Sequence, residues 1–421
     1  MKVSVESRES TLSFYFEPHP GDRIEMGKPD GSMRYRLARP DCRFFLPTVF
    51  ELEDCHPDLI AAVALAVCSS LGIKSLVLDK AVSRLFADTV GRFYRFGIKP
   101  VDDKLEPRKP RPASRPGLCF SGGVDSSAAL LLGPDDCVPV FLERSSPPDS
   151  MFMGIYDKDA PLRACRVLKK AGWPVQAVKT DIEFLRSPVG FFNDLVMATP
   201  LILLADHLNL DSIAYGLILE SAYLAKGFRY RDYAQSGHFK RYNGIAAAAG
   251  LPFNLPTAGL SELVTTRLVL ESPLQHTAQS CVRGPFGRPC MMCWKCFRKN
   301  LLEASVTGEG IPKQELRRYF GMPDVAAELA KAPIKHENVI AYIAGNYRGQ
   351  SEQMRELAGR LGVEELDLDW TTRWLPCSRE VLAERYHKQI EEKITRLVEP
   401  MNERDIANIE SWDRLPGEKG R

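Results

Sequence analysis

Residues 118–132 read Leu-Cys-Phe-Ser-Gly-Gly-Val-Asp-Ser-Ser-Ala-Ala-Leu-Leu-Leu, so two glycines and several polar side chains separate two apolar runs. This pattern predicts a buried strand, a tight glycine turn and a helix that starts near Asp125. The start of a helix offers free N–H groups and a positive dipole end, and phosphate is the usual ligand there. The hydroxyls of Ser121 and Ser126 would add donors, and Asp125 could cap the helix or hold a Mg²⁺ ion. The stretch therefore predicts a phosphate-binding loop.

A cysteine cluster is the second group of residues whose types and spacing could do chemistry. Its members follow a Cys-x8-Cys-x2-Cys-x2-Cys pattern: Cys281, Cys290, Cys293 and Cys296. Four thiolates at this spacing can close a tetrahedral metal site, for which zinc is the expected ion and an iron–sulfur cluster the competing one. With all four positions filled by sulfur, such a metal would have a structural role. The other seven of the eleven cysteines are scattered, and they are expected to be small core residues.

The glycine stretch is not a Walker A loop, because no Gly-x-x-x-x-Gly-Lys-Ser/Thr occurs in the chain. It resembles instead the Ser-Gly-Gly-x-Asp-Ser signature of the PP-loop ATP pyrophosphatases. The resemblance implies that the loop grips the β- and γ-phosphates of ATP, and that AMP is transferred to a substrate oxygen with release of pyrophosphate. The residues implied to contact the nucleotide are Phe120, Ser121, Gly122, Gly123, Val124, Asp125, Ser126 and Ser127. Among them Ser121, Asp125 and Ser126 are expected to be catalytic. The alternative is an ordinary strand–turn–helix with small residues at the bend.

The segments after the loop alternate between expected strands and helices up to residue 216, which predicts a parallel sheet covered on both faces. Ligands of such sheets bind beyond the carboxyl ends of the strands. We therefore expect Gly216 to line the nucleotide site, and backbone groups at Phe141 and Leu142 to contact adenine. Residues 220–254 are rich in aromatic and basic side chains. Glu220, Arg231 and Tyr233 are the candidate substrate contacts there, and the alternative is a lid whose rings pack on the body of the protein.

The glycine loop and the cysteine cluster, about 160 residues apart, together resemble the QueC family of 7-cyano-7-deazaguanine synthases. Arg298, two residues after the last cysteine, is similar to the end of the QueC zinc motif. The resemblance covers about residues 117–305. It implies ATP, Mg²⁺ and one Zn²⁺ as cofactors, and adenylation of 7-carboxy-7-deazaguanine followed by reaction with ammonia to an amide and then a nitrile.

The sequence departs from QueC proteins after the last expected core strand, where it reads Gly-Leu-Ile-Leu-Glu at 216–220 and no Asp-Cys pair follows. It also carries about 100 additional residues at each end. In this it looks more like the enlarged QueC-like proteins of bacterial anti-phage islands of the CBASS and Qat types. That likeness implies a ligase that joins a deazaguanine acid to an amine of a co-encoded protein. A small-molecule nitrile synthase, a tRNA-modifying PP-loop enzyme and a non-catalytic scaffold are the competing hypotheses.

The chain as a whole is expected to be an α/β protein with a doubly wound parallel sheet of the PP-loop (HUP) type. Residues 1–100 predict an N-terminal α+β domain, in which residues 2–16 alternate like strands and residues 28–31 form a turn. Residues 101–116 predict a proline-rich basic linker, either a solvated connector or an arm that touches RNA. The PP-loop domain is expected over 117–305, with the zinc knuckle at 281–296. A helical extension follows over 306–421, with a long helix at 379–399 and a disordered tail after residue 413.

The composition excludes several classes of protein. With 56 basic and 54 acidic side chains the net charge is +2, so a strong basic face for tRNA is not expected. No apolar run approaches the length of a bilayer span, and the first residues lack the apolar core of a signal peptide. These observations predict a cytoplasmic protein without membrane contact, and they leave a homodimer open.

Overall fold

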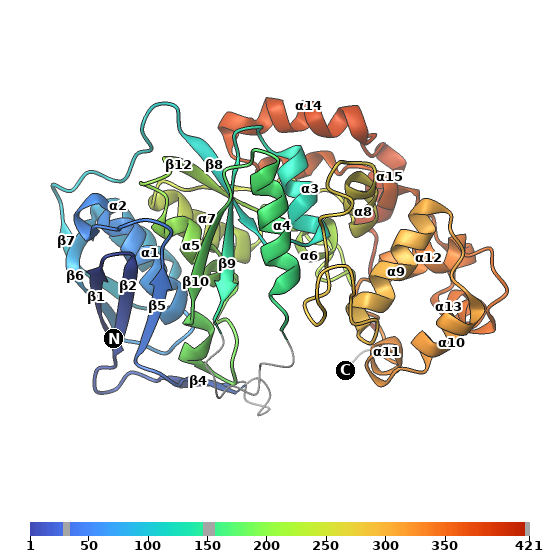
Figure 1. The fold of residues 1–421 in the computed structure, drawn as a ribbon, viewed down its shortest axis with the longest axis horizontal. Helices are drawn as coiled ribbons and strands as arrows, with labels where there is room; N and C mark the ends of the chain where they lie inside the picture. Colours follow the sequence, from blue (N-terminus) through green and yellow to red (C-terminus); the bar gives the residue numbers. More distant parts are fainter. Residues whose placement is uncertain (28–33, 146–155, 417–421) are drawn as a thin grey trace.

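The computed structural model describes residues 1–27, 34–145 and 156–416 (Figure 1). The strands are β1 Lys2–Arg8, β2 Thr11–Glu17, β3 Glu25–Met26, β4 Tyr35–Leu37, β5 Asp41–Phe45, β6 Ser75–Ser83, β7 Gly97–Asp102, β8 Arg115–Phe120, β9 Val138–Arg144, β10 Gln176–Thr180, β11 Arg186–Ser187, β12 Leu210–Tyr215 and β13 Phe253–Asn254. The α-helices are α1 Pro57–Cys68, α2 Arg84–Phe93, α3 Val124–Leu132, α4 Asp159–Lys170, α5 Thr199–Leu203, α6 Leu219–Ala222, α7 Gly237–Ala248, α8 Glu262–Leu270, α9 Trp294–Thr307, α10 Lys313–Phe320, α11 Pro323–Leu329, α12 Glu337–Asn346, α13 Glu352–Leu361, α14 His387–Leu397 and α15 Glu403–Glu410.

A large, mostly parallel sheet forms the centre of the molecule, with the strand order β13-β12-β8-β9-β10-β5-β2-β1-β6-β7. The strands from β13 to β10 are all parallel to one another. From β8 the chain adds β9 and β10 on one side, and it then crosses over to add β12 and β13 on the other side. The strand order therefore reverses beside β8, which is where open parallel sheets bind their ligands. The prediction of an α/β fold with a largely parallel sheet is confirmed.

Helices cover both faces of this parallel part (Figure 1). On one face, Leu118 and Phe120 of β8 and Phe141 of β9 share a buried cluster with α4. On the other face, α5 packs against β8 and β9. Because the strands are buried on both sides, they read as nearly continuous apolar runs in the sequence.

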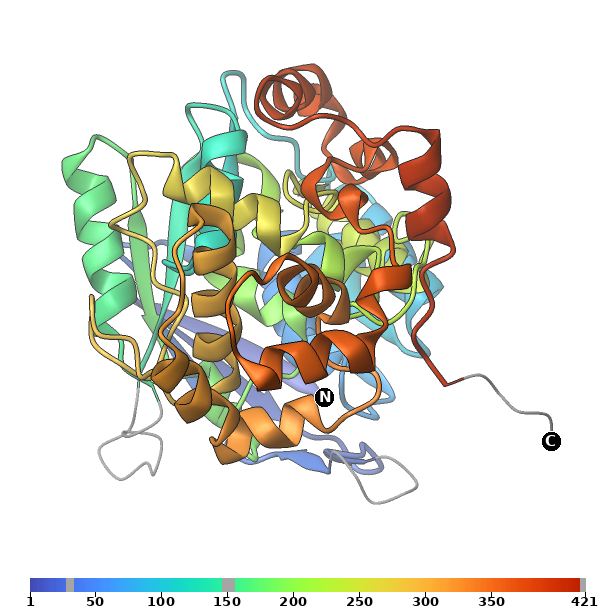
Figure 2. The same ribbon diagram turned by 90° about the vertical axis from the view of Figure 1, so that its right-hand side faces the viewer.

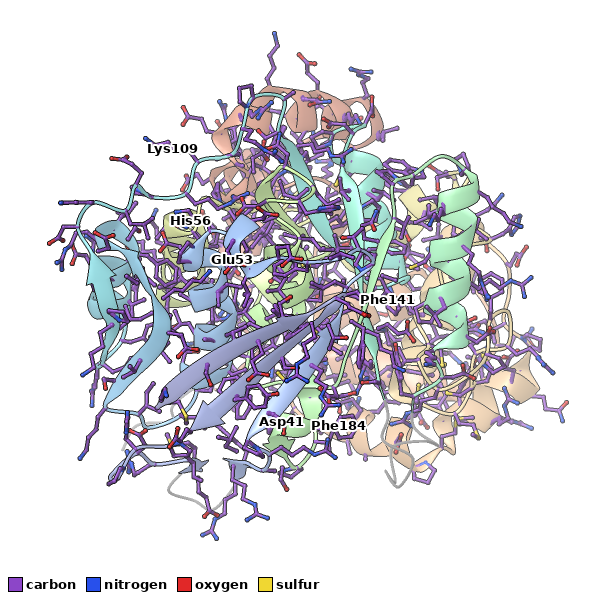
Figure 3. The ribbon with its side chains drawn as sticks, turned by 60° about the vertical axis from the view of Figure 1, so that its left-hand side comes forward. Asp41, Glu53, His56, Lys109, Phe141 and Phe184 are labelled. Atoms are coloured by element: carbon purple, nitrogen blue, oxygen red, sulfur yellow. The ribbon has the colours of Figure 1, made fainter. Side chains whose placement is uncertain are left out.

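Residues 1–102 extend the same sheet. β5 pairs antiparallel with β10, so that Phe44 lies opposite Thr180 and Phe45 opposite Lys179. In β2 the side chains alternate between buried Phe14 and exposed Tyr15, which confirms the strand pattern expected for this segment. α1 and α2 pack on the buried face, and no α-helix of the described residues covers the other face of β1, β2 and β5 (Figure 3). The boundary expected near residue 100 thus falls within a continuous sheet.

The basic linker is fixed to the body of the protein by hydrogen bonds from Arg108, Arg111 and Ser114. Residues 103–114 contain no helix or strand, and Lys109 lies at the periphery (Figure 3). The neighbouring Arg108 is buried, however, and its guanidinium binds the Asp206 carboxylate at 2.8 Å and two backbone carbonyls. A run of basic residues gives no sign of which one is buried, so the sequence did not reveal this anchor.

Helices α9 to α13 gather at the end of the molecule opposite the N-terminal strands, as Figures 1 and 2 show.

The prediction of one long helix over 379–399 is wrong. Helix α14 covers only the second half of this range, and two 3₁₀ turns precede it. The reason is tertiary contact, because the backbone N–H of Ala383 donates to the Asn254 side chain and Val381 C=O accepts from Leu255 N. The turn expected at 28–31 lies outside the described residues, as do residues 417–421. The tail expected to be disordered after residue 413 is ordered at Arg414, whose guanidinium donates to the Leu361 carbonyl at 2.9 Å and whose backbone N–H donates to the Phe228 carbonyl at 2.8 Å. In the described part of the chain, no helix combines the length and apolar character needed to cross a membrane.

Candidate functional site

The glycine loop connects β8 to α3 at the reversal point of the sheet. Gly122 has φ +75°, and a side chain there would also collide with Pro161, since a Cβ would lie 2.9 Å from its Cα. The backbone N–H of Ser121 donates to Ser126 Oγ at 3.2 Å, and the two serine hydroxyls are 3.0 Å apart. Gly123 is the N-cap of α3 and has no side chain to cap the helix. The N–H of Val124 donates to Ser280 Oγ at 3.4 Å, but those of Asp125 and Ser126 have no acceptor within the described residues and remain available to a ligand.

The end of β12 lies directly against the first turn of α3. A Cβ added to Gly216 would be 2.5 Å from both the carbonyl carbon of Asp125 and the nitrogen of Ser126. Only glycine permits this close approach of two backbones. Gly216 therefore sets the position of the loop helix, in addition to lining the cavity described next.

The loop opens into a cavity of about 590 Å³, a size common for small-molecule sites. On the loop side its walls are formed by Ser121, Gly123, Asp125 and Ser126. The remaining walls include Tyr215, Gly216, Arg231, Tyr233, Tyr242, Phe253, Ser280 and Lys295. The structure thus brings the three expected catalytic residues together with two of the three expected substrate contacts.

Arg231 is held in a defined orientation at the cavity wall. Its Nε donates to the carbonyl of Ala222 at 2.7 Å and its Nη2 to the carbonyl of Ser221 at 2.8 Å. Its guanidinium carbon lies 5.3 Å from the ring centroid of Tyr233. No acceptor for Nη1 is found among residues 1–27, 34–145 and 156–416, so this group can bind an anionic ligand.

Other residues expected at the site lie behind it. Phe120, Val124 and Ser127 are buried beside the loop, and Phe141 and Leu142 are buried within β9; none of them lines the cavity. Glu220 does not line it either: its carboxylate accepts the Glu262 backbone N–H at 3.0 Å and the Asn338 amide at 2.7 Å. These two donors come from distant parts of the chain, so Glu220 holds elements of the fold together and does not face the cavity.

A buried ionic cluster that sequence reasoning missed stands behind the loop. Glu262, fully buried at the start of α8, accepts from Arg298 at 2.7 Å, from Lys299 at 2.9 Å and from His336 at 3.0 Å. Burial would raise the pKa of Glu262, but the charges of Arg298 and Lys299 hold it well below its usual value. Glu262 is therefore ionised and neutralises the cations around it.

This cluster also positions the loop carboxylate. Lys299 lies 3.3 Å from Asp125 Oδ1, and the hydroxyl of Thr265 donates to the same oxygen at 3.1 Å. Asp125 keeps 27% of its side chain exposed toward the cavity. The signal in the sequence was the Arg298–Lys299 pair between Phe297 and Leu301, two apolar residues of α9 that are buried, because buried cations require a buried acid.

We expect Glu262→Ala to lower the free energy of unfolding by about 3–5 kcal/mol, since it leaves Arg298 and Lys299 buried without their counter-charge. Urea denaturation measures the effect. Glu271→Ala is the matched control, because Glu271 is an exposed acid at the other end of α8. Equal losses in the two variants would contradict the ionic role of Glu262.

The buried Glu220 gives the fold a dependence on pH. Burial raises the pKa of its carboxyl from 4.5 to about 7. The hydrogen bond from Asn338 lowers this pKa, and the negative charge of Glu262 raises it further. Because the folded-state pKa lies above the unfolded one, the protonated carboxyl stabilises the fold below pH 4.5, and this contribution is lost as the pH rises to about 7. The free energy of unfolding of the wild type should therefore fall relative to that of Glu220→Gln across this interval. The free energies of unfolding are measured by urea titration at each pH. If those of the wild type and of Glu220→Gln change in parallel with pH, the raised pKa of Glu220 is refuted.

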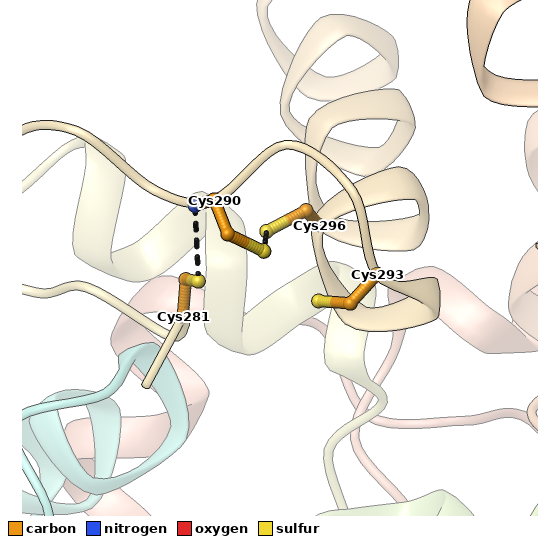
Figure 4. Close-up of side chains that lie close together, drawn as sticks. All are labelled: Cys281, Cys290, Cys293 and Cys296. Atoms are coloured by element: carbon orange, nitrogen blue, oxygen red, sulfur yellow. Dashed lines mark hydrogen bonds between the residues drawn. The ribbon is translucent and has the colours of Figure 1, made fainter. Parts of the chain in front are cut away.

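The four cysteines converge at the start of α9 (Figure 4). Their sulfur atoms all lie within 4.8 Å of one another, and those of Cys290 and Cys296 are 3.6 Å apart. A tetrahedral zinc with Zn–S bonds of about 2.3 Å needs sulfurs about 3.8 Å apart, so the arrangement fits such an ion. The Cys281 sulfur also accepts N–H groups from Arg283 at 3.4 Å and Cys290 at 3.3 Å. The cluster could hold a metal ion such as zinc, with no ligand position left open for water.

The segment that leads into the cysteine cluster also touches the glycine loop. The backbone N–H of Gln279 donates to the carbonyl of Gly122 at 2.9 Å, and the hydroxyl of Ser280 accepts the N–H of Val124 at 3.4 Å. The side-chain amide of Gln279 donates to the carbonyls of Cys281, Gly284 and Pro285. The cysteine loop therefore supports the glycine loop through one glutamine and one serine.

A protein-family model matches a stretch of the chain that includes the cysteine cluster. The family is DUF6395, described as a family of unknown function, and the match spans residues 241–413. This segment contains Glu262, the four cysteines and the C-terminal helices, but not the glycine loop. No curated protein and no solved structure matches the chain.

Proposed function

We propose that this protein is an AMP-forming ATP-dependent ligase of the PP-loop type, which adenylates a carboxylic acid and releases pyrophosphate. The observation that carries the proposal is the position of the Ser-Gly-Gly-Val-Asp-Ser loop. It begins a helix beside the reversal point of a parallel sheet, and it forms one wall of a cavity large enough for a substrate.

In the proposed reaction, the N–H groups at the start of α3 and the Ser121 hydroxyl bind the β- and γ-phosphates. The partly exposed carboxylate of Asp125 would hold Mg²⁺, which neutralises phosphate charge. A substrate carboxylate oxygen then bonds to the α-phosphorus, and the bond from this phosphorus to the bridging oxygen breaks. Pyrophosphate leaves with the electron pair, and an acyl-adenylate open to attack by an amine remains.

The side chains that line the cavity favour a planar aromatic acid as the substrate. Tyr233, Tyr215 and Phe253 present rings to it, and the free Nη1 of Arg231 can pair with a carboxylate. The resemblance of loop and cysteines to QueC proteins makes 7-carboxy-7-deazaguanine the specific candidate. For the acceptor we propose an amine of a co-encoded protein partner, and ammonia, with a nitrile as the final product, is the alternative outcome of the test.

The proposal is tested by measuring pyrophosphate release from ATP and Mg²⁺ in the presence of 7-carboxy-7-deazaguanine. 7-Deazaguanine, which lacks the carboxyl group, is the matched control and should give no release. Co-expression with neighbouring gene products, followed by intact-mass analysis, identifies a protein acceptor by its mass increase. Equal release with both compounds would contradict adenylation of the acid.

A further inference from the structure

We propose that Lys295 is the cation that binds the terminal phosphates of ATP and offsets the charge of the departing pyrophosphate. This inference rests on the proposed function. It starts from a shortage of positive charge at the loop itself: residues 118–132 contain no lysine or arginine, and Asp125 adds a negative charge. A triphosphate bound at this loop alone would meet only N–H groups, hydroxyls and a helix dipole. A cation must therefore reach the loop from elsewhere in the fold.

Helix α9 carries three basic side chains toward this region, and two of them are already neutralised. Arg298 is buried and binds both oxygens of Glu262. Lys299 is buried between Glu262 and Asp125. Neither can move to a ligand without leaving a buried carboxylate unpaired, which is costly. Both cations therefore belong to the protein framework.

Lys295 differs from them in exposure and in its partners. It is the first basic residue of α9, one turn before Lys299, and its side chain is exposed to solvent. Within the described part of the chain, no carboxylate lies within ion-pair distance of its ammonium group. It lines the cavity together with Ser121, Gly123 and Asp125, so an anion at the loop would lie within reach of this side chain.

A second cavity shares this residue with the first. A neighbouring space of about 460 Å³ is lined by Lys295, Ser280, Lys299 and residues of the cysteine loop. Lys295 and Ser280 thus line both spaces, and Ser280 accepts the N–H of Val124 in the first turn of the loop helix. This space beside the loop, lined by a lysine that makes no ion pair within the described residues, provides room for pyrophosphate.

The metal cluster would fix this cation in place. Lys295 lies between Cys293 and Cys296, two of the four sulfur residues at the start of α9 (Figure 4). When the α-phosphorus bond to the bridging oxygen breaks, negative charge grows on the leaving oxygen. The positive charge of Lys295 would stabilise that oxygen, so this residue acts on the leaving group and not on the nucleophile.

The test compares binding of ATP, pyrophosphate and AMP, each with Mg²⁺, by calorimetry to the wild type, Lys295→Gln and Lys295→Arg. A charge-assisted hydrogen bond to phosphate contributes about 1.5–3 kcal/mol, so Lys295→Gln should bind ATP and pyrophosphate at least about 10-fold more weakly. AMP affinity should stay within about 3-fold, and Lys295→Arg should retain most of the pyrophosphate affinity. Lys313→Gln, a change at an exposed lysine at the start of α10, is the control.

The possible outcomes separate this inference from the proposed function. If the wild type binds neither ATP nor pyrophosphate, the proposed function fails and the inference fails with it. If the wild type binds both and Lys295→Gln binds them equally well, only the role of Lys295 is refuted. An equal loss of AMP and pyrophosphate affinity in Lys295→Gln would also refute it, because this result indicates a disturbed loop. Metal content is measured in every variant, since two of the cysteines flank the substituted residue.

Discussion

Asp125→Asn is expected to lower the rate of pyrophosphate release at least about 100-fold while the protein stays folded. The carboxylate faces the cavity at the start of α3, where it would hold the Mg²⁺ that neutralises the phosphates. An amide keeps the size of the side chain and loses the charge. The fold should tolerate the change, because Lys299 keeps its ion pair with Glu262 at 2.9 Å. The measurement is the turnover of ATP with the carboxylic acid, together with a thermal melt.

A matched control for this prediction lies just beyond the same helix. Asp136 is exposed and makes no ion pair in the part of the chain that the structure describes, so Asp136→Asn should leave the rate unchanged. Ser121→Ala removes the exposed hydroxyl of the loop and should also suppress turnover. Wild-type rates in both Asp125→Asn and Ser121→Ala would refute the assignment of the loop as the reaction site.

Cys290→Ala is expected to lose the metal ion, to destabilise the protein and to weaken ATP binding. Three sulfurs leave the tetrahedral site incomplete. A metal that binds the folded state alone stabilises it by about 4 kcal/mol when its concentration is 1,000 times its Kd, and the variant should lose stability of this order. ATP binding should weaken because Gln279 and Ser280 join the cysteine loop to the N–H and C=O groups of the glycine loop.

Metal analysis by mass spectrometry, urea denaturation and calorimetry with ATP measure these three effects. Cys377→Ala is the control, because Cys377 is an exposed cysteine outside the cluster. It should keep the metal, the stability and the affinity of the wild type. A full metal content in Cys290→Ala would contradict the four-sulfur site, and unchanged ATP affinity in a metal-free variant would refute the support of one loop by the other.

The local parts of the fold could be predicted from the sequence. The strand, turn and helix at the glycine loop follow from apolar runs and from two glycines that are adjacent in the chain. The cysteine cluster was also predictable, because its four ligands lie within sixteen residues and the spacing suits a metal. Both features depend on residues that are close in sequence.

Contacts between distant segments could not be predicted in this way. The continuous sheet depends on pairing between β5 and β10, for which neither strand carries a distinguishing signal. Glu220 was expected to contact the substrate because it belongs to the stretch 220–254, which is rich in aromatic and basic side chains. Its donors, Glu262 N and the Asn338 amide, lie 42 and 118 residues away, and they bury it within the framework. The role of Lys299 depends in the same way on two acids from other elements.

The most direct test of the account is a crystal structure of the protein with Mg²⁺ and a non-hydrolysable ATP analogue. We expect the β- and γ-phosphates within hydrogen-bond distance of Ser121 and of the N–H groups that begin α3, with the α-phosphorus facing the cavity wall that carries Arg231. A nucleotide bound elsewhere in the molecule, or none at a saturating concentration, would contradict the account.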